Sequence, residues 1–167
     1  MRPFFVGCSA GRGAGAEIAG RSRGRGRTLA TMDVDSIMTR DVISTSPNES
    51  IRDALVKIED QEIRHLPVVD DGRLVGMISD RDLREQRLPL MEELDDPDYA
   101  DNLLSAPISS VMSGDVLSVD TGESLRAAID LMIEYKVGAV PVVDRDTGRL
   151  AGIVSYIDVL RALRPVD

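Results

Sequence analysis

The chain of 167 residues has no tryptophan, and aromatic residues of any kind make up only 3% of it. Its hydrophobic core must therefore be built from aliphatic side chains and methionine, and stacking of nucleic-acid bases on aromatic rings is disfavoured as a binding mode. The chain also has one cysteine, Cys8, and one histidine, His65. A lone cysteine cannot form an internal disulfide, and with one histidine the usual zinc ligand sets cannot be assembled. The sequence therefore predicts no metal site and no cofactor, and a reducing compartment, the cytoplasm, fits this cysteine usage.

Long hydrophobic runs are absent too. No run approaches the roughly 20 residues that cross a bilayer, so no membrane span is predicted. Residues 1–31 carry six arginines against one glutamate, a net charge of +5, which leaves −14 for residues 32–167 out of the total of −9. The acidic body should repel nucleic acid, and only the basic N-terminal segment could contact it. Nucleic acid is therefore not a predicted partner.

Residues 1–31 are rich in Gly, Ala, Ser and Arg and show no periodicity. This composition is typical of a disordered tail or of an organelle-targeting segment, and Met32 stands directly before the first organised residues as an alternative start of translation. The stretch Gly11–Ala16, GRGAGA, fits a dinucleotide-binding fingerprint. That motif works only between a buried strand and a helix, and an Arg-Gly run follows here instead. We interpret the match as a coincidence.

Two copies of one unit make up the rest of the chain. Aligning Met38 with Met112 gives 12 identities in 33 positions, and aligning Gly72 with Gly148 continues the register with 6 identities in 11. A repeat of this length indicates a duplicated supersecondary unit rather than a solenoid. Both copies end in Pro-Val-Val-Asp, a glycine turn, a second apolar run and Ser-x-x-Asp.

Each copy predicts a strand, a helix, a hairpin of two strands and a second helix. Capping boxes at Ser46–Glu49 and Asp120–Glu123 predict the starts of the first helices. Tight turns are predicted at Asp71-Gly72 and Thr147-Gly148. The strands are expected, in chain order, over residues 41–44, 66–69, 74–78, 115–119, 140–143 and 150–154.

An acidic segment, residues 87–107, separates the copies and contains EELDDPDYADN. We interpret it as a solvated connector, part helix and part loop. A cation site formed by Asp95, Asp96, Asp98 and Asp101 is the alternative, although no loop spacing typical of a calcium site supports it. The predicted organisation is a tail at 1–31, a first domain at 35–86, a linker at 87–107 and a second domain at 108–164.

Catalytic signatures are missing from the sequence. It has no G-x-S-x-G elbow, no H-E-x-x-H, no P-loop and no carboxylate pair that the pattern brings face to face. The chain is therefore not expected to be an enzyme.

The most suggestive residues for chemistry are two Ser-x-x-Asp motifs, Ser79 with Asp82 and Ser155 with Asp158, each placed where a helix should begin. A serine at a helix N-cap offers its hydroxyl beside free backbone N–H groups, which suits phosphate, and a carboxylate one turn later can accept two ribose hydroxyls. The same pattern is also a capping box that only starts the helix. The residues alone leave both interpretations open.

The tandem order of strand, helix, L-P-V-V-D, hairpin, G-h-h-S-x-x-D (h for apolar) and helix resembles a pair of cystathionine-β-synthase (CBS) domains, called a Bateman module. The resemblance covers about residues 35–163 and is closest to short bacterial proteins made of a CBS pair alone, including the acetoin-utilisation type. It implies an α/β (α+β) fold of two β-α-β-β-α repeats packed about a pseudo-twofold axis. It also implies two clefts that bind adenosyl ligands such as AMP, ADP, ATP or S-adenosylmethionine.

By this resemblance, Asp82 and Asp158 contact the ribose, and the phosphate side is formed by Ser79, Ser155, Arg64, His65 and Arg81. The counterparts of the three basic residues in the second repeat are Gly138, Ala139 and Ile157, so only the first repeat is equipped for a polyphosphate. Alternatively, His65 is a strand-edge histidine, and the two arginines are solvated surface charges.

The apolar slots for adenine are expected on short segments in front of each helix and on the central strands. Their residues are Val42, Ile43, Leu66, Pro67, Val116, Leu117, Val140 and Pro141, all of which could equally be ordinary core residues.

These features predict a regulatory module that binds an adenosyl ligand between two repeats and signals through dimer geometry to an unidentified partner protein. A homodimer is expected from the resemblance. The alternative is a ligand-free CBS scaffold for dimerisation, in which Ser-x-x-Asp is only a helix cap.

Overall fold

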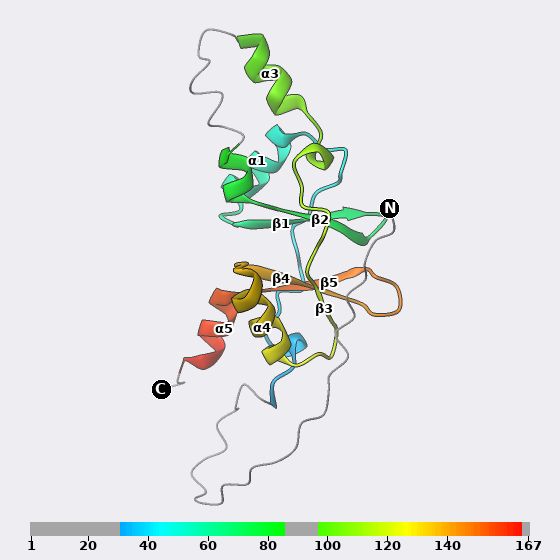
Figure 1. Cartoon of the computed structure of the whole chain (residues 1–167), viewed down its shortest axis with the longest axis vertical. Coiled ribbons are helices and arrows are strands. Elements are labelled where there is room, and N and C mark those ends of the chain that lie inside the picture. The colour runs from blue at the N-terminus through cyan, green and yellow to red at the C-terminus, as the bar shows by residue number, and fades with distance from the viewer. Residues whose placement is uncertain (1–30, 86–96, 165–167) are drawn as a thin grey trace, which may run out of the picture.

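The computed structural model describes residues 31–85 and 97–164 of the chain. No helix in these ranges is long and apolar enough to span a membrane. One helix, over residues 80–85, has no label in Figure 1 and is named here by its residues. The other elements are η2 (Val34–Ser36), α1 (Ile51–Asp60), β1 (His65–Asp70), β2 (Arg73–Ser79), α3 (Pro97–Ser105), η3 (Ile108–Ser110), β3 (Val119–Asp120), α4 (Leu125–Tyr135), β4 (Ala139–Val143), β5 (Leu150–Ser155) and α5 (Tyr156–Leu163).

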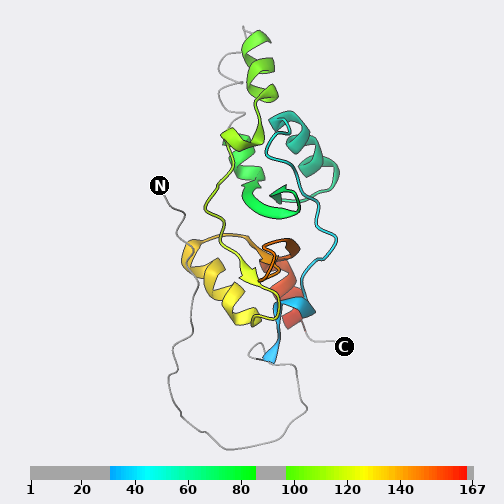
Figure 2. The same cartoon turned by 90° about the vertical axis from the view of Figure 1, so that its right-hand side faces the viewer.

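The strands form two small sheets that face one another in the middle of the molecule. β1 and β2 form an antiparallel hairpin, whereas β4 pairs with β3 in parallel and with β5 antiparallel. Helix α1 covers the outer side of one sheet, and α4 and α5 cover the outer side of the other (Figures 1 and 2). Helices on the outside and sheets on the inside confirm the predicted α/β fold of two repeats.

The two hairpins meet through their backbones. Leu150 N donates to Gly72 O at 3.1 Å, and Leu74 N donates to Gly148 O at 3.3 Å. Each bond joins one repeat to the other, and the pair relates the hairpins by an approximate twofold rotation. The predicted turn at Asp71-Gly72 is confirmed, because both residues have positive φ angles, 48° and 81°. The second turn is longer than predicted.

In the second hairpin, Val143 pairs with Leu150, so six residues separate the strands. The carboxylate of Asp144 accepts hydrogen bonds from the Thr147 amide at 2.8 Å and from its hydroxyl at 2.6 Å. These bonds stabilise a wide loop, because an aspartate side chain can replace a backbone acceptor in a turn. The same bonds hold the pKa of the Asp144 carboxyl below its ordinary value.

The predicted starts of the first helices are wrong by four residues. The N-caps are Ser50 and Ser124, and Ser50 forms a capping box with Asp53. The earlier motif at Ser46 folds as a separate turn, in which Glu49 N donates to Ser46 O at 3.1 Å. The Glu49 carboxylate is engaged by Lys57 and by the Thr45 hydroxyl, which outweigh desolvation and lower its pKa. Both motifs fit a capping box, and spacing alone does not select between them.

The predicted first strands are also much shorter than expected. Residues 41–44 form no strand, and only Thr45 pairs with β1, through Thr45 N to Pro67 O at 3.0 Å and Val69 N to Thr45 O at 2.8 Å. In the second repeat the strand predicted over residues 115–119 is reduced to β3, Val119–Asp120. The remaining predicted strands agree with β1, β2, β4 and β5 to within two residues.

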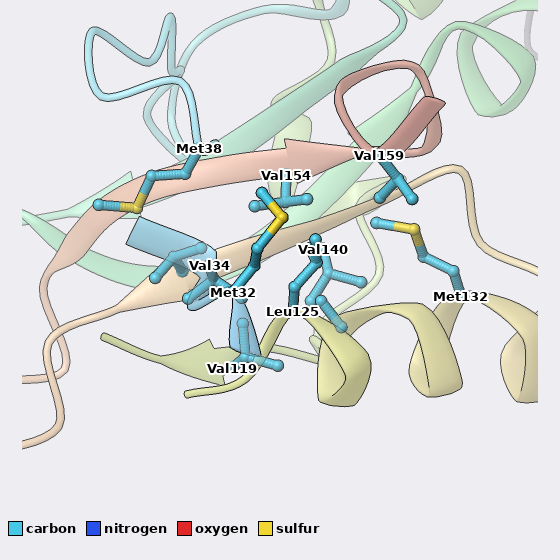
Figure 3. Packing of buried hydrophobic residues seen from close by; sticks show 11 residues of the cluster. Met32, Val34, Met38, Val119, Leu125, Met132, Val140, Val154 and Val159 are labelled. Carbon is cyan, nitrogen blue, oxygen red and sulfur yellow. The ribbon is translucent and has the colours of Figure 1, made fainter. Parts of the chain in front are cut away.

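Each repeat completes its core with a segment from the other repeat. Met32, Val34 and Met38 lie in the second-repeat core with Val140 and Val154, as Figure 3 shows. Reciprocally, Ile108 is fully buried among α1, β1 and β2, and Val111 and Met112 pack against that cluster. The segment that begins each sequence repeat therefore packs against the opposite repeat.

The chain then crosses from one sheet to the other. Thr39 exchanges two backbone hydrogen bonds with Ile153 of β5, at 2.9 and 3.0 Å, before Thr45 joins β1. In the same way, Ser113 exchanges two bonds of 3.0 Å with Met77 of β2 before Val119 joins β4. Residues 40–44 and 114–118 are thus anchored at both ends, to different sheets.

The part of the acidic linker that the structure describes is helical. Arg52 of α1 donates to Asp101 of α3 at 2.6 Å, so this aspartate has a partner. Asp95, Asp96 and the segment 1–30 lie outside the described residues. Within the described ranges no group of three or more acidic, cysteine or histidine side chains could hold a metal ion.

Candidate ligand cleft

Both Ser-x-x-Asp motifs lie at the junction between a strand and a helix, as predicted. Ser79 ends β2, and the Asp82 Oδ2 atom accepts from the Ser79 amide at 2.8 Å and from its hydroxyl at 2.6 Å. In the second repeat, Asp158 Oδ2 accepts from the Ser155 amide at 2.9 Å and its hydroxyl at 2.6 Å. The two carboxylates therefore cap their helices through one oxygen, which leaves the other oxygen, Oδ1, for a further contact.

The second carboxylate oxygen has different surroundings in the two repeats. Asp158 Oδ1 lies 3.6 Å from Arg161 Nη1. The position of Arg161 is occupied in the first repeat by Glu85, and Asp82 makes no ion pair within the described residues. A ligand hydroxyl would compete with an arginine at Asp158 but not at Asp82, so Asp82 is the better placed acceptor.

The two repeats meet beside these motifs at His65. A Cβ atom added to Gly138 would lie 2.8 Å from His65 Cε1 and 3.0 Å from Nε2, so the imidazole rests directly on the backbone of the second repeat. Arg64 Nη1 lies 3.5 Å from the hydroxyl of Tyr156, the first residue of α5. Arg64, His65 and Tyr156 thus form one cluster that spans the repeats.

Burial determines the protonation state of His65. Desolvation lowers the pKa of the imidazole and Arg64 lowers it further, whereas the carboxylates of Asp80 and Asp82 raise it, without offsetting the burial. The ring is therefore held neutral near pH 7. A ligand anion placed beside the ring would favour its protonated form.

Arg81 does not join this cluster. Its side chain is 85% exposed and pairs with Glu85 at 3.2 Å, one turn along the same helix. Arg64 is also exposed, but its guanidinium points across the junction to Tyr156. The structure therefore brings together Arg64, His65 and the Ser79–Asp82 motif, and leaves Arg81 on the surface.

The residues predicted for the adenine slots fall into two groups. Val42, Ile43, Val116 and Leu117 are half-buried and lie on the crossing segments 40–44 and 114–118. The strand residues Leu66, Pro67, Val140 and Pro141 are buried, so their side chains belong to the cores and only their backbone could face a ligand. The crossing segments are thus the available apolar surface between the sheets.

Two clefts border this region. One, of about 200 Å³, is formed by both repeats and contains the predicted Val42; its lining residues are Arg40, Val42, Ser44, Val69, Gly72, Arg149 and Leu150. The other, of about 430 Å³, lies between α1 and the 80–85 helix and contains Arg64; it is lined by Leu55, Ile58, Glu59, Glu62, Ile63, Arg64, Asp80 and Arg84. Asp82 is not among the lining residues of either cleft.

Sequence reasoning missed the roles of Gly138 and Tyr156. Gly138 stands where the first repeat has Arg64, and this loss of a side chain was the signal that something packs there. Tyr156 could not be found from the pattern, because its contact with Arg64 arises only from the packing of the two repeats.

The CBS domain family matches residues 34–88 and 108–165, so the chain belongs to the CBS family as a tandem pair. Among its relatives, the uncharacterized protein MJ1225 of Methanocaldococcus jannaschii is 31% identical over 137 residues, 77% of this chain and 46% of that protein. The CBS domain-containing protein YhcV of Bacillus subtilis is 32% identical over 126 residues, 75% of this chain and 81% of YhcV. The chain therefore spans less than half of the first relative and most of the second.

Solved structures of CBS pairs have the same fold. CBSX2 from Arabidopsis thaliana, in complex with AMP, is 30% identical with a TM-score of 0.66, over 78% of this chain and 95% of that one. The CBS pair of MJ0100, in complex with 5′-methylthioadenosine and S-adenosyl-L-methionine, is 28% identical with a TM-score of 0.64, over 79% and 95%. The Vibrio cholerae protein AcuB, named for acetoin utilization, is 30% identical with a TM-score of 0.65, over 79% of this chain and 90% of that one. The predicted likeness to CBS-pair and acetoin-utilisation proteins is confirmed.

Proposed function

We propose that this protein is a non-catalytic regulatory module that binds an adenosyl ligand, AMP, ADP, ATP or S-adenosylmethionine, at the junction of its two CBS repeats. The observation that carries the proposal is the cluster at that junction. It contains an acceptor, Asp82, with one oxygen outside its helix cap, and two nitrogen-bearing side chains, Arg64 and His65, at the start of the neighbouring strand β1. CBS pairs that resemble this chain have been solved with AMP and with S-adenosyl-L-methionine.

The roles of the residues follow from their chemistry. Asp82 accepts the ribose hydroxyls, Ser79 lies toward the phosphate beside the amides of the helix start, and Arg64 and His65 neutralise the phosphate. Arg81 contributes only through its charge, because it is paired with Glu85. Val116 and Leu117 of the crossing segment offer the apolar surface for adenine.

In the second repeat the corresponding site binds a ligand with no net charge or with a single charge. Asp158 retains the carboxylate and Ser155 the hydroxyl, but Gly138 and Ala139 replace the basic pair. Val42 and Ile43 provide its apolar slot. We therefore assign polyphosphate binding to the first repeat alone.

The ligand acts by changing how two copies of the chain associate. Two copies form a homodimer, whose geometry the ligand biases by binding one arrangement more tightly, and a separate partner protein in the cytoplasm responds to the difference. Because the ligand contacts both repeats, its free energy of binding depends on how the two sheets sit against each other. The domains that move are the CBS units at 35–86 and 108–164, joined by the linker at 87–107.

A thermal-stability measurement on the full chain tests this proposal. AMP, ADP, ATP, S-adenosylmethionine and, as a control, GTP are added separately. A ligand present at 100 times its dissociation constant adds about 2.7 kcal/mol to the free energy of unfolding, a shift of several degrees in Tm for a chain of this size. Stabilisation by adenosyl ligands but not by GTP supports the proposal, whereas an equal Tm in all samples contradicts it.

One observation favours a ligand-free scaffold as the second candidate function. Both serines and both aspartates already satisfy one another as capping boxes, so the motifs have a complete structural role without any ligand. In that case the CBS pair acts only in dimerisation, and no nucleotide changes its Tm.

A further inference from the structure

The smaller of the two clefts, which we name the hairpin cleft, lies at the turn end of both hairpins. Alternate residues of the crossing segment 40–44 line it, and the rest of its wall comes from the ends of β1 and β5 and from the first turn. Its two cationic side chains are Arg40 from the first repeat and Arg149 from the second. The hairpin cleft therefore has one arginine from each repeat.

The hairpin cleft is distant from both Ser-x-x-Asp motifs. Gly72 directly precedes β2 and Ser79 ends it, and β2 has seven residues. A strand rises about 3.3 Å per residue, so about 20 Å separates Gly72 from Ser79. The second hairpin is arranged in the same way, because Leu150 begins β5 and Ser155 ends it. A ligand in the hairpin cleft is thus separate from one bound at the two motifs.

Arg149 has no carboxylate partner in the part of the chain that the structure describes. Most of the described arginines form an ion pair with an aspartate or a glutamate, namely Arg40, Arg52, Arg81, Arg84, Arg126, Arg145 and Arg161. Arg149 and Arg73, which pair with each other through an isolated backbone bridge, form none. Two arginines without a carboxylate partner are therefore adjacent where the repeats join.

The carboxylates near Arg149 are engaged elsewhere. Asp144 accepts hydrogen bonds within its own loop, and Asp120 accepts from Arg145 at 2.9 Å. Arg149 donates from Nη1 to the backbone carbonyl oxygen of Asp71 at 3.1 Å, across the repeats. A guanidinium has five N–H donors, so four remain for another acceptor.

The first turn holds the Arg149 side chain in place. A Cβ atom added to Gly72 would lie 2.5 Å from Arg149 Cζ and 3.0 Å from Nε, so the guanidinium rests on the Gly72 backbone. At Gly148, the equivalent position of the second turn, no atom lies within 4 Å of an added Cβ. A guanidinium that is already positioned loses less conformational entropy when it binds an anion.

The related position in the other half of the molecule is not equipped in this way. The counterpart of Arg40 is Gly114, so that side lacks the arginine of the crossing segment. Arg73, the counterpart of Arg149, does not rest on Gly148. Of the two places related by the approximate twofold rotation, only the hairpin cleft combines a positioned arginine with a second one.

We propose that the hairpin cleft binds a small phosphate-type anion between Arg40 and Arg149. A guanidinium donates two parallel N–H bonds to phosphate oxygens, and the Ser44 hydroxyl offers a further donor. Arg40 is available because its ion pair with Asp35 is long, 3.9 Å, and exposed, and such pairs contribute little. Since the anion contacts both repeats, its binding stabilises their junction.

The size of the hairpin cleft limits the anion. Its volume is about 200 Å³, below the range of about 300–1,000 Å³ that is typical of sites for larger organic ligands. A free phosphate ion or a small phosphomonoester therefore fits, and a nucleotide does not. This inference goes beyond the proposed function and does not rest on it. Val42 is common to the hairpin cleft and to the proposed adenine slot, so the tests use other residues to separate the two sites.

The first test locates the anion by heteronuclear NMR of the full chain, titrated with inorganic phosphate at constant pH and ionic strength. The amide signals of Gly72 and Leu150 should shift and saturate, whereas those of Ser79 and Gly138 should move little. A parallel titration with glycerol 3-phosphate identifies the source: tighter binding indicates a phosphomonoester, and equal binding indicates phosphate itself. Shifts that do not saturate, or that are confined to Ser79 and Gly138, overturn the proposal.

The second test uses variants in the same titration. Arg149→Gln and Arg40→Gln should each weaken phosphate binding about tenfold, because each removes a charge-assisted hydrogen bond. The matched control Arg145→Gln removes the same charge from the same hairpin and should change the affinity by less than about twofold. An equal loss in Arg145→Gln would mean that net charge alone attracts the anion, which overturns the proposal.

Arg64→Gln separates this site from the proposed adenosyl site. It should leave phosphate binding in the hairpin cleft unchanged, because Arg64 lies beside Ser79 and not beside Gly72. Loss of phosphate binding in Arg64→Gln but not in Arg149→Gln would assign the anion to the adenosyl site. That result overturns the present proposal and leaves the proposed function standing. The amide spectrum of each variant checks that it is folded.

Discussion

The imidazole of His65 rests on the backbone of Gly138, the residue that replaces Arg64 in the second repeat. A side chain at position 138 would meet this ring at 2.8 Å, closer than carbon atoms normally approach. The second repeat therefore has glycine where the first repeat has Arg64, and the His65 ring of the first repeat occupies the space that a side chain at position 138 would fill. At this position the difference between the two repeats is therefore part of how they pack.

Gly138→Ala should destabilise the protein by about 1–3 kcal/mol, because the added methyl group displaces the His65 ring. His65→Ala removes the obstacle, so the double variant should be more stable than the sum of the two single changes predicts. Urea unfolding of the four proteins measures this coupling. Simple additivity would mean that the ring and position 138 do not interact.

The stability of the ligand-free protein should fall as the pH is lowered through the ordinary histidine pKa of about 6.5. Burial lowers the pKa of His65 in the folded state. The unfolded chain therefore binds the proton first, near its ordinary pKa of about 6.5, and the loss ends below the folded pKa. His65→Gln should remove this part of the pH dependence, which urea unfolding at several pH values can measure. An unchanged slope in that variant contradicts the assignment.

Ligand binding should have the opposite pH dependence. A phosphate beside His65 raises the pKa of the imidazole again, so binding takes up a proton, and affinity increases as the pH falls through the window between the two pKa values. The phosphate itself also titrates near pH 6. Calorimetry measures the affinity for ATP at several pH values in the wild type and in His65→Gln. The titration of the phosphate contributes equally in both proteins, so the difference between their pH dependences is the contribution of His65. Equal slopes would place the phosphate away from His65.

Asp82→Ala should abolish stabilisation by adenosyl ligands, and Asp53→Ala should not. Both residues occupy the same place in a capping box, and Asp53 Oδ2 accepts from the Ser50 hydroxyl at 2.6 Å, as Asp82 Oδ2 does from Ser79. Each change therefore removes the carboxylate of a capping box, but only Asp82 lies at the junction of the repeats. Thermal shifts with and without ligand compare them directly. Equal ligand shifts in the two variants would assign Asp82 to the cap alone.

Gly152→Ala should be more destabilising than Gly76→Ala. A methyl group at Gly152 would meet Met38 Sδ at 2.5 Å and the Thr39 carbonyl oxygen at 3.0 Å, whereas at Gly76 the backbone contact, Ser113 O, is at 3.3 Å. A methionine side chain can move aside but a bonded carbonyl cannot, so the closer carbonyl sets the larger cost, about 1–3 kcal/mol. Urea unfolding of both variants gives the order, and the reverse order would contradict this explanation.

The order of the elements could be predicted from the sequence because each signal was local. β-branched runs placed β1, β2, β4 and β5, and Asp71-Gly72 placed a hairpin turn. In the first repeat the helix start was missed because two motifs four residues apart, at Ser46 and Ser50, each fitted a capping box, and Lys57 engages Glu49 of the earlier one. The ion pair between Lys57 and Glu49 joins α1 to the turn that precedes it, and no sequence motif predicts this contact.

Only the part of the site that depends on spacing within one motif could be predicted from the sequence. The Ser79–Asp82 contact was expected from spacing, and the structure has it. The exposure of Arg81 agrees with the alternative of a solvated surface charge. A basic residue next to a helix start can point either to a ligand or to its own helix, and Arg81 pairs with Glu85 one turn away. The position of His65 over Gly138 depends on tertiary packing, which a repeat alignment does not contain.

The exchange of segments 32–38 and 106–112 between the two cores has a consequence for how the protein can be divided. A fragment cut within the linker would lack Ile108 from the first core, and the other fragment would lack Val34 from the second. Each would be left with an unfilled cavity and an unpaired sheet edge, at Met77 in one and at Ile153 in the other. We therefore expect the halves to be complementing fragments that fold on mixing, and the intact chain to unfold in a single cooperative transition although its sequence contains two domains.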